Sequence, residues 1–458
     1  MAETKSNPAE LKMAAAAQST AKERLTYLYD EGRYTELDAF AANGAKLCGV
    51  VTAFGYVGGN ACYAFSQDVS VNGGALNRAQ AEKIAKVYDL AAKTGVPVVG
   101  IYDSFGADLN DGHEALNAYG ELMLAMSNLS GVVPQIAVVA GVCSGTSALL
   151  AESADFTVVA EGAELYVTPN TGASAENAAA NGTAALVASD DKAAVEAAKT
   201  LIEKLPMNNL SPVPMYEYDL PSAAAGKDAK SLAEGILDAN SITELYADFG
   251  KASYTALATL GGAAVGFVAT NKTASALTAD DCSKIARFVR TCDAFAVPVI
   301  TVVDTEGFEG GSETEAAGAV KNMAKLAHAY AEATTIKVSV VTGRAYGAAF
   351  IALAGKGANA DLTYAIEDAV ITPLAPITAA EFFYHDELAG AENVKDKRLQ
   401  LAARYSAEEG SPVAAAAKGC IDGVTTSAQL RDTLITAVEI LAGKRISRLP
   451  KKHSNIQL

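Results

Sequence analysis

The chain has 458 residues, half of them hydrophobic, and its 36 lysines and arginines against 53 aspartates and glutamates give a formal net charge of −17. This length can bury a large core in two or three domains, and an acidic chain without a basic block argues against a nucleic-acid partner. Four histidines are few for a metal or acid–base enzyme, and six cysteines without a Cys-x-x-Cys pair are typical of reduced thiols rather than of a zinc ribbon or a disulfide framework.

The N-terminal segment, MAETKSNPAELKMAAAAQST, lacks the apolar core of a signal peptide. No run in the sequence approaches the roughly 18 uninterrupted apolar residues that predict a membrane-spanning helix. We therefore expect a cytoplasmic protein without a membrane span.

The first half of the chain alternates helices and strands. Residues 83–95 have apolar side chains at helical spacing and precede a short β-branched strand at 96–103. A polar loop follows, then a second helix at 117–130 and another buried strand at 135–141. This alternation indicates parallel pairing in an α/β protein.

Two segments interrupt the alternation. The alanine-rich segment 173–189 has little to pack, so we expect it to be a surface excursion. Prolines crowd into the segment 205–228, which opposes regular structure. This segment predicts a boundary between two domains near residue 215.

The second half repeats the plan of the first. Residues 282–308, CSKIARFVRTCDAFAVPVITVVDTEGF, echo residues 81–107, AEKIAKVYDLAAKTGVPVVGIYDSFGA, at a separation of 201 residues. The landmarks matched in the same order are Pro97 and Pro298, Asp103 and Asp304, Gly141 and Gly343, Gly145 and Gly347, and Pro169 and Pro373. Their nearly constant separation indicates a tandem duplication.

A glycine turn follows the buried strand of each half. In the first half, Gly141 to Gly145 fits Gly-x-Cys-x-Gly, a thiol version of the hydrolase nucleophile elbow, so Cys143 is a candidate nucleophile. In the second half, Ala345 stands at the place of Cys143. The shared feature is therefore the pair of glycines before an apolar helix.

The glycines suit a site that binds an anion. A helix start presents unpaired N–H groups with partial positive charge, and glycine lets a ligand oxygen approach the backbone. Such donors stabilise an oxyanion, and losing one typically costs about 10²–10³ in rate. The alternative, close packing of helix on strand without a ligand, explains one such turn more readily than two matched turns.

Several segments resemble the carboxyltransferase subunits of biotin-dependent acyl-CoA carboxylases and decarboxylases, of the propionyl-CoA carboxylase β and methylmalonyl-CoA decarboxylase α type. The likeness is strongest at residues 63–84, 187–210, 284–308 and 344–365. The closing segments KGCIDGVTT and KKHSNIQL also match the family's ending. Taken together, these segments extend the resemblance over nearly the whole chain.

The resemblance implies a fold, a reaction and partners. The fold is an α/β tandem duplication of a crotonase-like ββα-spiral domain, with residues 1–215 on the acyl-CoA side and residues 216–458 on the biotin side. The reaction moves CO₂ between N1 of biotin on a carrier protein and the carbon α to a CoA thioester, with propionyl-CoA and methylmalonyl-CoA favoured. The implied partners are a biotin carboxyl carrier protein and either a biotin carboxylase or the subunits of a membrane decarboxylase complex. In the second case, the chain would lie at the cytoplasmic side of that complex. The implied assembly is a homohexamer, a trimer of dimers.

The resemblance also assigns residues to two oxyanion holes. Gly145 and Thr146 match the first, which holds the thioester oxygen as it becomes an enolate. Gly347 and Ala348 match the second, which holds the ureido oxygen of biotin. The substrate-binding positions that accompany them are Gly106, Ala107, Cys143, Ser144 and Tyr346.

No side-chain base and no metal ion is implied, because the biotin anion left by decarboxylation can take the α-proton. The histidines are therefore expected at surface or packing positions; they are His113, His328, His385 and His453. The chain also lacks a Met-Lys-Met acceptor for biotin and a Gly-rich nucleotide-binding signature. A carboxyltransferase of this kind would need a separate biotin carrier, and the sequence leaves the direction of the reaction open.

Three positions depart from the family's pattern. Thr146 and Ala348 each stand where a second glycine is usual, so a side chain narrows the space beside the backbone donor. Asp108 replaces an arginine in the loop that follows Asp103, and an acid there is unfavourable beside an anionic ligand. These changes bear on which acyl substrate is bound more than on which type of reaction is catalysed.

Two alternative functions stay open. One is a crotonase-fold enzyme that acts on CoA esters without biotin, although duplication argues against it because a single-domain enzyme needs no second hole. The other is a non-catalytic scaffold subunit; the altered loops at 103–108 and 143–147 are the reason to consider it. Binding of biotin or of CoA would separate these alternatives from a carboxyltransferase.

Overall fold

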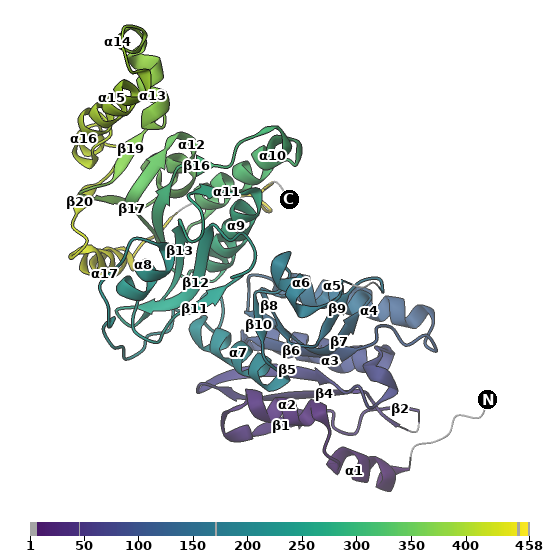
Figure 1. The fold of residues 1–458 in the computed structure, drawn as a ribbon. Coiled ribbons are helices and arrows are strands. Elements are labelled where there is room, and N and C mark those ends of the chain that lie inside the picture. The colour runs from purple at the N-terminus through teal and green to yellow at the C-terminus, as the bar shows by residue number, and fades with distance from the viewer. Residues whose placement is uncertain (1–6, 45, 170–171, 447–448, 457–458) are drawn as a thin grey trace. The chain divides into compact units, whose positions relative to one another are not determined.

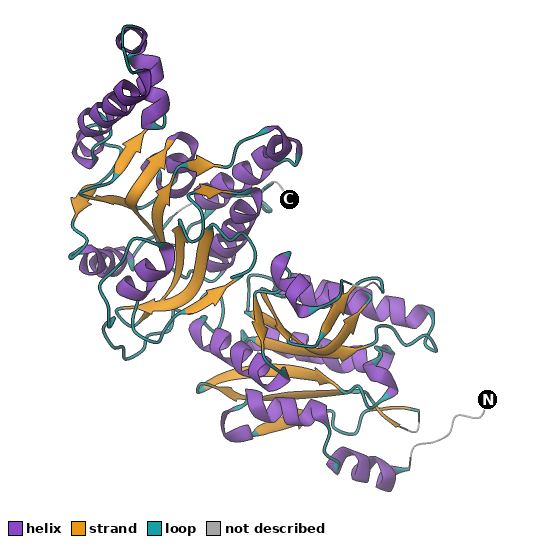
Figure 2. Cartoon of the chain, viewed as in Figure 1, coloured by secondary structure: helices purple, strands orange, loops and turns teal. Residues whose placement is uncertain are grey.

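The structure is a computed structural model, and it describes residues 7–44, 46–169, 172–446 and 449–456 (Figure 1). The chain divides into two compact units, Met1–Pro214 and Met215–Leu458. Each unit contains one large mixed sheet with helices packed around it (Figure 2). The division falls inside the proline-rich segment 205–228.

The sheet of the first unit has the strand order β1-β4-β5-β6-β7-β8-β10, with β9 attached to the end of β7. The first three strands pair antiparallel and the others continue in parallel. Their bounds are β1 Tyr34–Leu37, β4 Val50–Val57, β5 Asn60–Gln67, β6 Val98–Ser104, β7 Gln135–Ser144, β8 Phe156–Ala160, β9 Glu164–Tyr166 and β10 Leu186–Ala188. Strand β6 is buried along its whole length, as expected for a central parallel strand.

The helices of the first unit flank this sheet. They are α1 Pro8–Ala16, α2 Thr20–Leu28, α3 Arg78–Thr94, α4 His113–Leu129, α5 Thr146–Glu152, α6 Ala175–Ala180 and α7 Asp191–Lys204; a short hairpin is formed by β2 Ala42–Asn43 and β3 Lys46–Leu47. Helix α3 shows why the predicted helix forms. The Asn77 side chain accepts the N–H of Gln80 at its start, and Gly95 ends it in the left-handed conformation with φ 65°.

The second unit repeats the first strand for strand. Its sheet has the order β11-β12-β13-β15-β17-β18-β20, with β19 attached to β17. The bounds are β11 Thr243–Leu245, β12 Ser253–Leu260, β13 Ala263–Thr270, β15 Val299–Thr305, β17 Lys337–Tyr346, β18 Leu362–Ile366, β19 Val370–Thr372 and β20 Gly423–Thr425; β14 Ala276–Leu277 pairs with β16 Gly307–Phe308. The predicted α/β class and the tandem duplication are confirmed.

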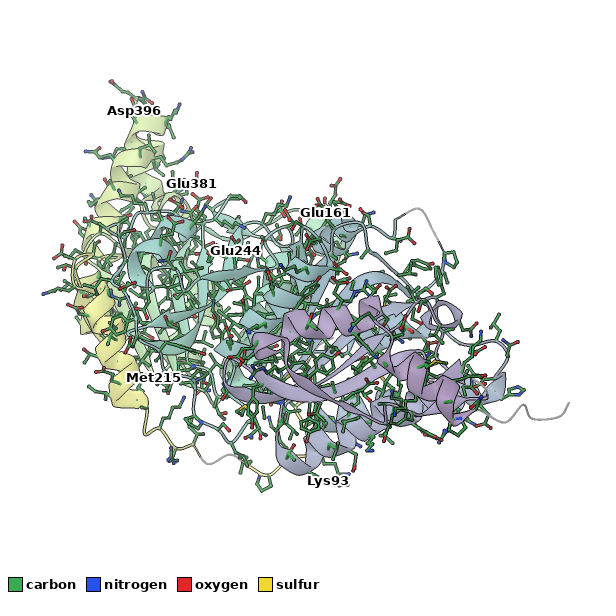
Figure 3. The ribbon with its side chains drawn as sticks, turned by 90° about the horizontal axis from the view of Figure 1, so that it is seen from below. Lys93, Glu161, Met215, Glu244, Glu381 and Asp396 are labelled. Atoms are coloured by element: carbon green, nitrogen blue, oxygen red, sulfur yellow. The ribbon has the colours of Figure 1, made fainter. Side chains whose placement is uncertain are left out.

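The helices of the second unit are α8 Ala229–Ile236, α9 Ala279–Ala294, α10 Ser312–Ala316, α11 Ala319–Glu332, α12 Gly347–Ala349, α13 Pro376–Phe383, α14 His385–Ala389, α15 Val394–Glu408, α16 Pro412–Ala417 and α17 Leu430–Leu441. Unlike the first unit, the second unit has a helical arm. Helices α13 to α15 project from the unit around a small core of their own, and Asp396 of this arm is labelled in Figure 3. Within the described ranges, no helix has the length and hydrophobicity needed to cross a bilayer.

The prediction that the segment 173–189 is a surface excursion is wrong. Ala175, Ala178 and Ala179 of α6 are buried, and β10 extends the sheet by pairing in parallel with β8. Alanine side chains are short, so a helix face made of them can lie close to a sheet. The segment therefore belongs to the core of the first unit.

A buried lysine connects the helix that follows the third strand of the large sheet, α3 or α9, to the backbone near that sheet in each unit. Lys284 of α9 is 2% exposed, and its ammonium donates to the carbonyl oxygens of Phe249 at 3.1 Å, Gly250 at 3.3 Å and Ser253 at 2.9 Å. In the first unit the matching Lys83 donates to a single carbonyl of β4, at 2.8 Å. An ammonium has three donors and no acceptor, so three carbonyl oxygens satisfy Lys284 fully.

We predict that Lys284→Met destabilises the protein, because the three carbonyl oxygens that Lys284 contacts each lose a hydrogen bond, two of them buried, at a cost of about 1–3 kcal/mol. The melting temperature measured by circular dichroism should fall clearly. Lys251→Met is the control, since the exposed Lys251 only approaches Asp248 at 3.9 Å, and exposed pairs contribute about 0–1 kcal/mol. Equal melting temperatures for the two variants would contradict the structural role of Lys284.

Candidate active site

Strand β7 changes neighbours along its ten residues. Residues 136–139 pair with β6 and β8, whereas residues 142–144 pair with β9 in place of β8, and Cys143 still pairs with Ser104 of β6. Between these two parts, the register with β6 shifts at the step from Tyr102 to Ser104, which indicates a β-bulge. Strand β17 shows the same shift at the matching place.

Asp103 fills the bulge of β7. Its carboxylate accepts the N–H of Val142 at 3.3 Å and the guanidinium of Arg24 at 2.8 Å. A Cβ on Gly141 would lie only 2.3 Å from the carboxylate oxygen of Asp103. The first glycine of the turn is therefore structural, because only glycine leaves room for this carboxylate.

Arg24 connects four elements of the first unit. Besides Asp103, its guanidinium donates to the Asp191 carboxylate at the start of α7, at 2.9 Å, and to the Ala140 carbonyl in β7, at 3.3 Å. The side chain is 6% exposed. Every guanidinium nitrogen thus has an acceptor, as a buried charge requires.

Asp304 fills the bulge of β17 in the same way. It accepts the backbone N–H of Arg344 at 2.9 Å, the side-chain Nε of Arg344 at 2.8 Å and the amide of Asn271 at 2.7 Å. A Cβ on Gly343 would lie 2.4 Å from its carboxylate. The Asp–Gly pairing that the repeat predicts is therefore a direct contact in both units.

The second glycine of the first turn adopts a conformation that favours glycine. Gly145 has φ 62° and ψ −132°, and no atom lies within 4 Å of the place where a Cβ would be. Its N–H donates to the carbonyl oxygen of Tyr166 at 2.9 Å. Thr146 begins α5, so its N–H has no acceptor within the helix. Of the two predicted donors, Thr146 is the one whose N–H the helix leaves for a ligand.

The second turn is more crowded than the first. Gly347 has φ 50°, and a Cβ there would lie 2.9 Å from the carbonyl oxygen of Pro373. Ala348 follows within the short helix α12, after which the chain continues as a π-helix at Phe350–Ala354. Tyr346 precedes Gly347, and burial raises the pKa of its phenol.

The predicted substrate-binding loop lies against the first turn. Gly106 has φ 102°, and a Cβ on it would lie 3.3 Å from the carbonyl oxygen of Ser144. Leu76 donates its N–H to the Gly106 carbonyl at 2.8 Å and pairs with Ala107 in an isolated bridge. The structure thus brings Gly106, Ala107 and Ser144 together beside Gly145.

Asp108 does not lie open beside a ligand, contrary to the expectation from its replacing an arginine. It is 6% exposed, and its carboxylate accepts the Asn72 amide at 2.9 Å. The backbone and side-chain N–H groups of Asn110 donate to it at 3.0 and 3.1 Å. Asp108 instead ties its own loop to the turn that contains Asn72.

Cys143 is unsuited to act as a nucleophile. Its side chain is fully buried, and this burial, with the Asp103 carboxylate nearby, raises the pKa of its thiol. The reactive form of cysteine is the thiolate, so a buried thiol that stays protonated is inert. The structure therefore favours the glycine frame over the thiol.

The histidines stand apart from the turns. His113, His385 and His453 are exposed, and His328 is partly exposed on α11. Among the residues that the structure describes, no three His, Cys, Asp or Glu side chains gather in a way that could hold a metal ion.

Three residues that shape the site are not among those predicted from the sequence: Arg24, Tyr166 and Pro373. Tyr166 and Pro373 act through backbone carbonyl oxygens, which any residue possesses, so residue type gives no signal for them. Arg24 lies 79 residues from Asp103 along the chain. The sequence matched Asp103 with Asp304 as landmarks of the repeat, but it gave no sign of the arginine that pairs with Asp103.

The comparisons with known proteins identify the family. The model described as "Carboxyl transferase domain" matches residues 12–456. The chain belongs to this family. It is 34% identical to methylmalonyl-CoA decarboxylase subunit alpha of Propionigenium modestum over 98% of this chain and 95% of that protein. It is 33% identical to the propionyl-CoA carboxylase carboxyltransferase subunit of Haloferax mediterranei over 96% of this chain and 93% of that protein.

The solved structures agree with this carboxyl transferase assignment. The transcarboxylase 12S structure with hydrolysed methylmalonyl-coenzyme A bound superposes with a TM-score of 0.90 at 30% identity, covering 98% of this chain and 94% of that chain. The predicted family, its carboxyltransferase activity and the duplicated crotonase-like fold are confirmed. The roles of single residues in this carboxyl transferase stay predictions.

We predict that Cys143→Ala keeps most of the carboxyl-transfer activity, since Ala345 already occupies the matching position. Gly145→Pro should abolish turnover, because proline fixes φ near −65° and removes the N–H that Tyr166 accepts. Gly347→Pro should do the same in the second unit. Turnover is measured by chromatography of the CoA esters, and circular dichroism checks folding. A folded but inactive Cys143→Ala, beside an active Gly347→Pro, would restore the nucleophile hypothesis.

Proposed function

We propose that this chain transfers a carboxyl group between biotin on a carrier protein and a short acyl-CoA, with propionyl-CoA and methylmalonyl-CoA as the substrate pair. The observation that carries the proposal is the pair of repeat-matched glycine turns, Gly141 to Gly145 and Gly343 to Gly347. A transfer between an enolate and a ureido anion needs two places where negative charge is stabilised. The names of the relatives, methylmalonyl-CoA decarboxylase subunit alpha and propionyl-CoA carboxylase, support the substrate class.

In this proposal the first unit takes the acyl-CoA. The N–H of Thr146 donates to the thioester oxygen, and Gly145 gives the backbone the conformation that turns this N–H outward. The loop at Gly106 and Ala107 lies beside the thioester, against Ser144. Loss of CO₂ from methylmalonyl-CoA places negative charge on the thioester oxygen, and a backbone donor there is worth about 10²–10³ in rate.

The second unit takes biotin in the same proposal. The N–H groups of Gly347 and Ala348 face the ureido oxygen, on which charge grows when carboxybiotin releases CO₂. Tyr346 lies beside this turn, and because burial raises the pKa of its phenol, the hydroxyl stays neutral and able to donate. The Pro373 carbonyl oxygen would lie 2.9 Å from a Cβ at Gly347, so this position of the turn requires glycine.

The proton and the carboxyl group balance without a side-chain base. In carboxylation, bound carboxybiotin would supply CO₂ by loss of its N1–carboxyl group, and the N1 left behind would accept the α-proton of propionyl-CoA, while the N–H groups of Gly347 and Ala348 would hold the ureido oxygen. The enolate then attacks CO₂, and the new carbon–carbon bond gives methylmalonyl-CoA. Decarboxylation reverses each step. The exposed positions of most histidines are compatible with this scheme.

We also propose that the working form is a homohexamer, a trimer of dimers, that meets a biotin carboxyl carrier protein and either a biotin carboxylase or a membrane decarboxylase subunit. The transcarboxylase 12S that matches this chain forms a hexamer assembly, which supports the same arrangement here. Apolar side chains stand exposed near each turn, including Phe105 and Leu109 in the first unit and Ile351 in the second. Contacts between subunits would cover such side chains.

The reaction is tested directly with the purified protein. Incubated with methylmalonyl-CoA and an isolated biotin carrier, it should release propionyl-CoA, and more slowly with free biotin, as followed by chromatography of the CoA esters. Malonyl-CoA and glutaconyl-CoA are run in parallel, because Thr146 and Phe105 reshape the acyl side. If none of these thioesters exchanges CO₂ in a biotin-dependent way and CoA does not bind, the proposal is wrong.

The assembly is tested by light scattering coupled to size exclusion. The expected mass is six times the 47.0 kDa of one chain, with a dimer as the smallest active species on dilution. A stable monomer that still transfers the carboxyl group would contradict this assembly.

A further inference from the structure

The contacts of Asp103 and Asp304 recur in both units although the residues around them differ. Each aspartate ends a central parallel strand and accepts the N–H of the residue that follows the first glycine of the turn, Val142 or Arg344. Each also has a guanidinium at 2.8 Å. The side chains of Asp103 and Asp304 are 8% and 16% exposed, so neither lies open to a ligand.

The bonded N–H lies close to the predicted oxyanion donor along the chain. In the first unit, Val142 starts the part of β7 that pairs with β9, and the N–H of Gly145 is held by Tyr166 at its end. In the second unit, Arg344 starts the pairing with β19 at the same distance before Ala348. The carboxylate that fixes the bulge therefore sets the direction in which the chain reaches Thr146 or Ala348.

A carboxylate at this place also has an electrostatic cost. Negative charge near a site where an anion forms raises the energy of that anion, most strongly where solvent is excluded. In the first unit the compensating cation is Arg24, which comes from α2. In the second unit it is Arg344, which belongs to the turn itself. The two units thus keep the ion pair although the arginine comes from a different place.

We propose that Asp103 and Asp304 are positioning residues for the two glycine turns, and that Arg24 and Arg344, which also pair with Asp191 and Glu306, offset part of the aspartate charge so that it opposes the bound anion less. This inference rests on the proposed function. It separates a backbone role for the aspartates from a charge role for the arginines, and each role has its own test.

The positioning role is tested by Asp103→Ala and Asp304→Ala. Misplacing a reacting group by about 1 Å can cost about 10²-fold in rate, so kcat should fall about 10- to 100-fold while KM changes little. Asp103→Asn should recover part of the loss, because asparagine keeps an oxygen that can accept the Val142 N–H.

Two further aspartates serve as matched controls. Asp30 accepts the N–H groups of Gly58 and Gly59 at 3.0 and 2.8 Å in the β4–β5 hairpin and pairs with a lysine. Asp238 accepts those of Gly261 and Gly262 at 2.9 and 2.8 Å in the β12–β13 hairpin and pairs with an arginine. Asp30→Ala and Asp238→Ala should lower the melting temperature and leave kcat within about threefold of the wild type, because neither hairpin belongs to the turns.

Hydrogen exchange gives a measure that does not depend on activity. Peptides that contain residues 141–148 should exchange faster in Asp103→Ala than in Asp30→Ala. Peptides that contain residues 343–350 should likewise exchange faster in Asp304→Ala than in Asp238→Ala.

The charge role is tested in the first unit, where Arg24 is buried. Arg24→Met leaves the Asp103 charge uncompensated, so kcat should fall further than in Asp103→Asn. The double variant Arg24→Met/Asp103→Asn should be more active than Arg24→Met alone. Removing an unpaired buried carboxylate also restores stability, so melting temperatures are measured beside kcat, and the charge role requires kcat to recover at a temperature at which both variants are fully folded.

The outcomes separate the two levels of the proposal. If Asp103→Ala and Asp304→Ala lose stability as their controls do but keep kcat, the positioning role is wrong. If the double variant is no better than Arg24→Met, the charge role is wrong. If the wild type is inactive towards every thioester while the turn peptides still exchange faster in the aspartate variants, the proposed function fails and the positioning of the turns stands.

Discussion

Each unit depends on one long strand that must satisfy two sets of neighbours. On one side, β7 pairs first with β8 and then with β9, while on the other side it pairs with β6 in both halves; β17 repeats this with β18, β19 and β15. Between the two halves, the register with β6 or β15 breaks in a bulge. The bulge leaves a backbone N–H that needs an acceptor, and an aspartate from the neighbouring strand supplies it. The glycine opposite that aspartate, the turn and the short helix all follow from this break.

Other carboxylates in the chain also accept backbone N–H groups and thereby fix turns and strand ends. Asp281 is fully buried and accepts the N–H groups of Ser253 and Thr278, at 2.8 and 2.9 Å. Asp238 does the same for the β12–β13 hairpin. An ionised carboxylate accepts several hydrogen bonds and makes stronger ones than a neutral group. Part of the acidic excess of the sequence is therefore internal structure rather than surface charge.

The fold could be predicted from the sequence because the duplication doubled each signal. Gly141 and Gly145 alone are weak evidence, but their repetition at Gly343 and Gly347 indicated both the domain plan and the place of the turns. Cys143 could be set aside for the same reason, since Ala345 stands in its place.

The partners of these residues could not be predicted. Arg24 meets Asp103 from 79 residues away and Asp191 from 167 residues away. Aligning Asp30 with Asp238 places Leu232 at the position of Arg24, so comparing the repeats conceals this arginine. The prediction for the segment 173–189 is wrong because small side chains do not exclude burial: in α6 they permit close packing.

The two turns show what a duplicated site can change and what it must keep. Around Gly145 no atom approaches the Cβ position, and a threonine follows; around Gly347 the Pro373 carbonyl lies 2.9 Å from that position, and an alanine follows. These differences alter the surroundings of each turn, as our proposal of a different ligand for each turn requires. The bulge, its carboxylate and the glycine with positive φ are unchanged, because they direct backbone N–H groups that no side chain can replace. A duplicated scaffold can therefore acquire a second specificity through the residues beside the turn, while the geometry that we propose stabilises an anion stays common to both units.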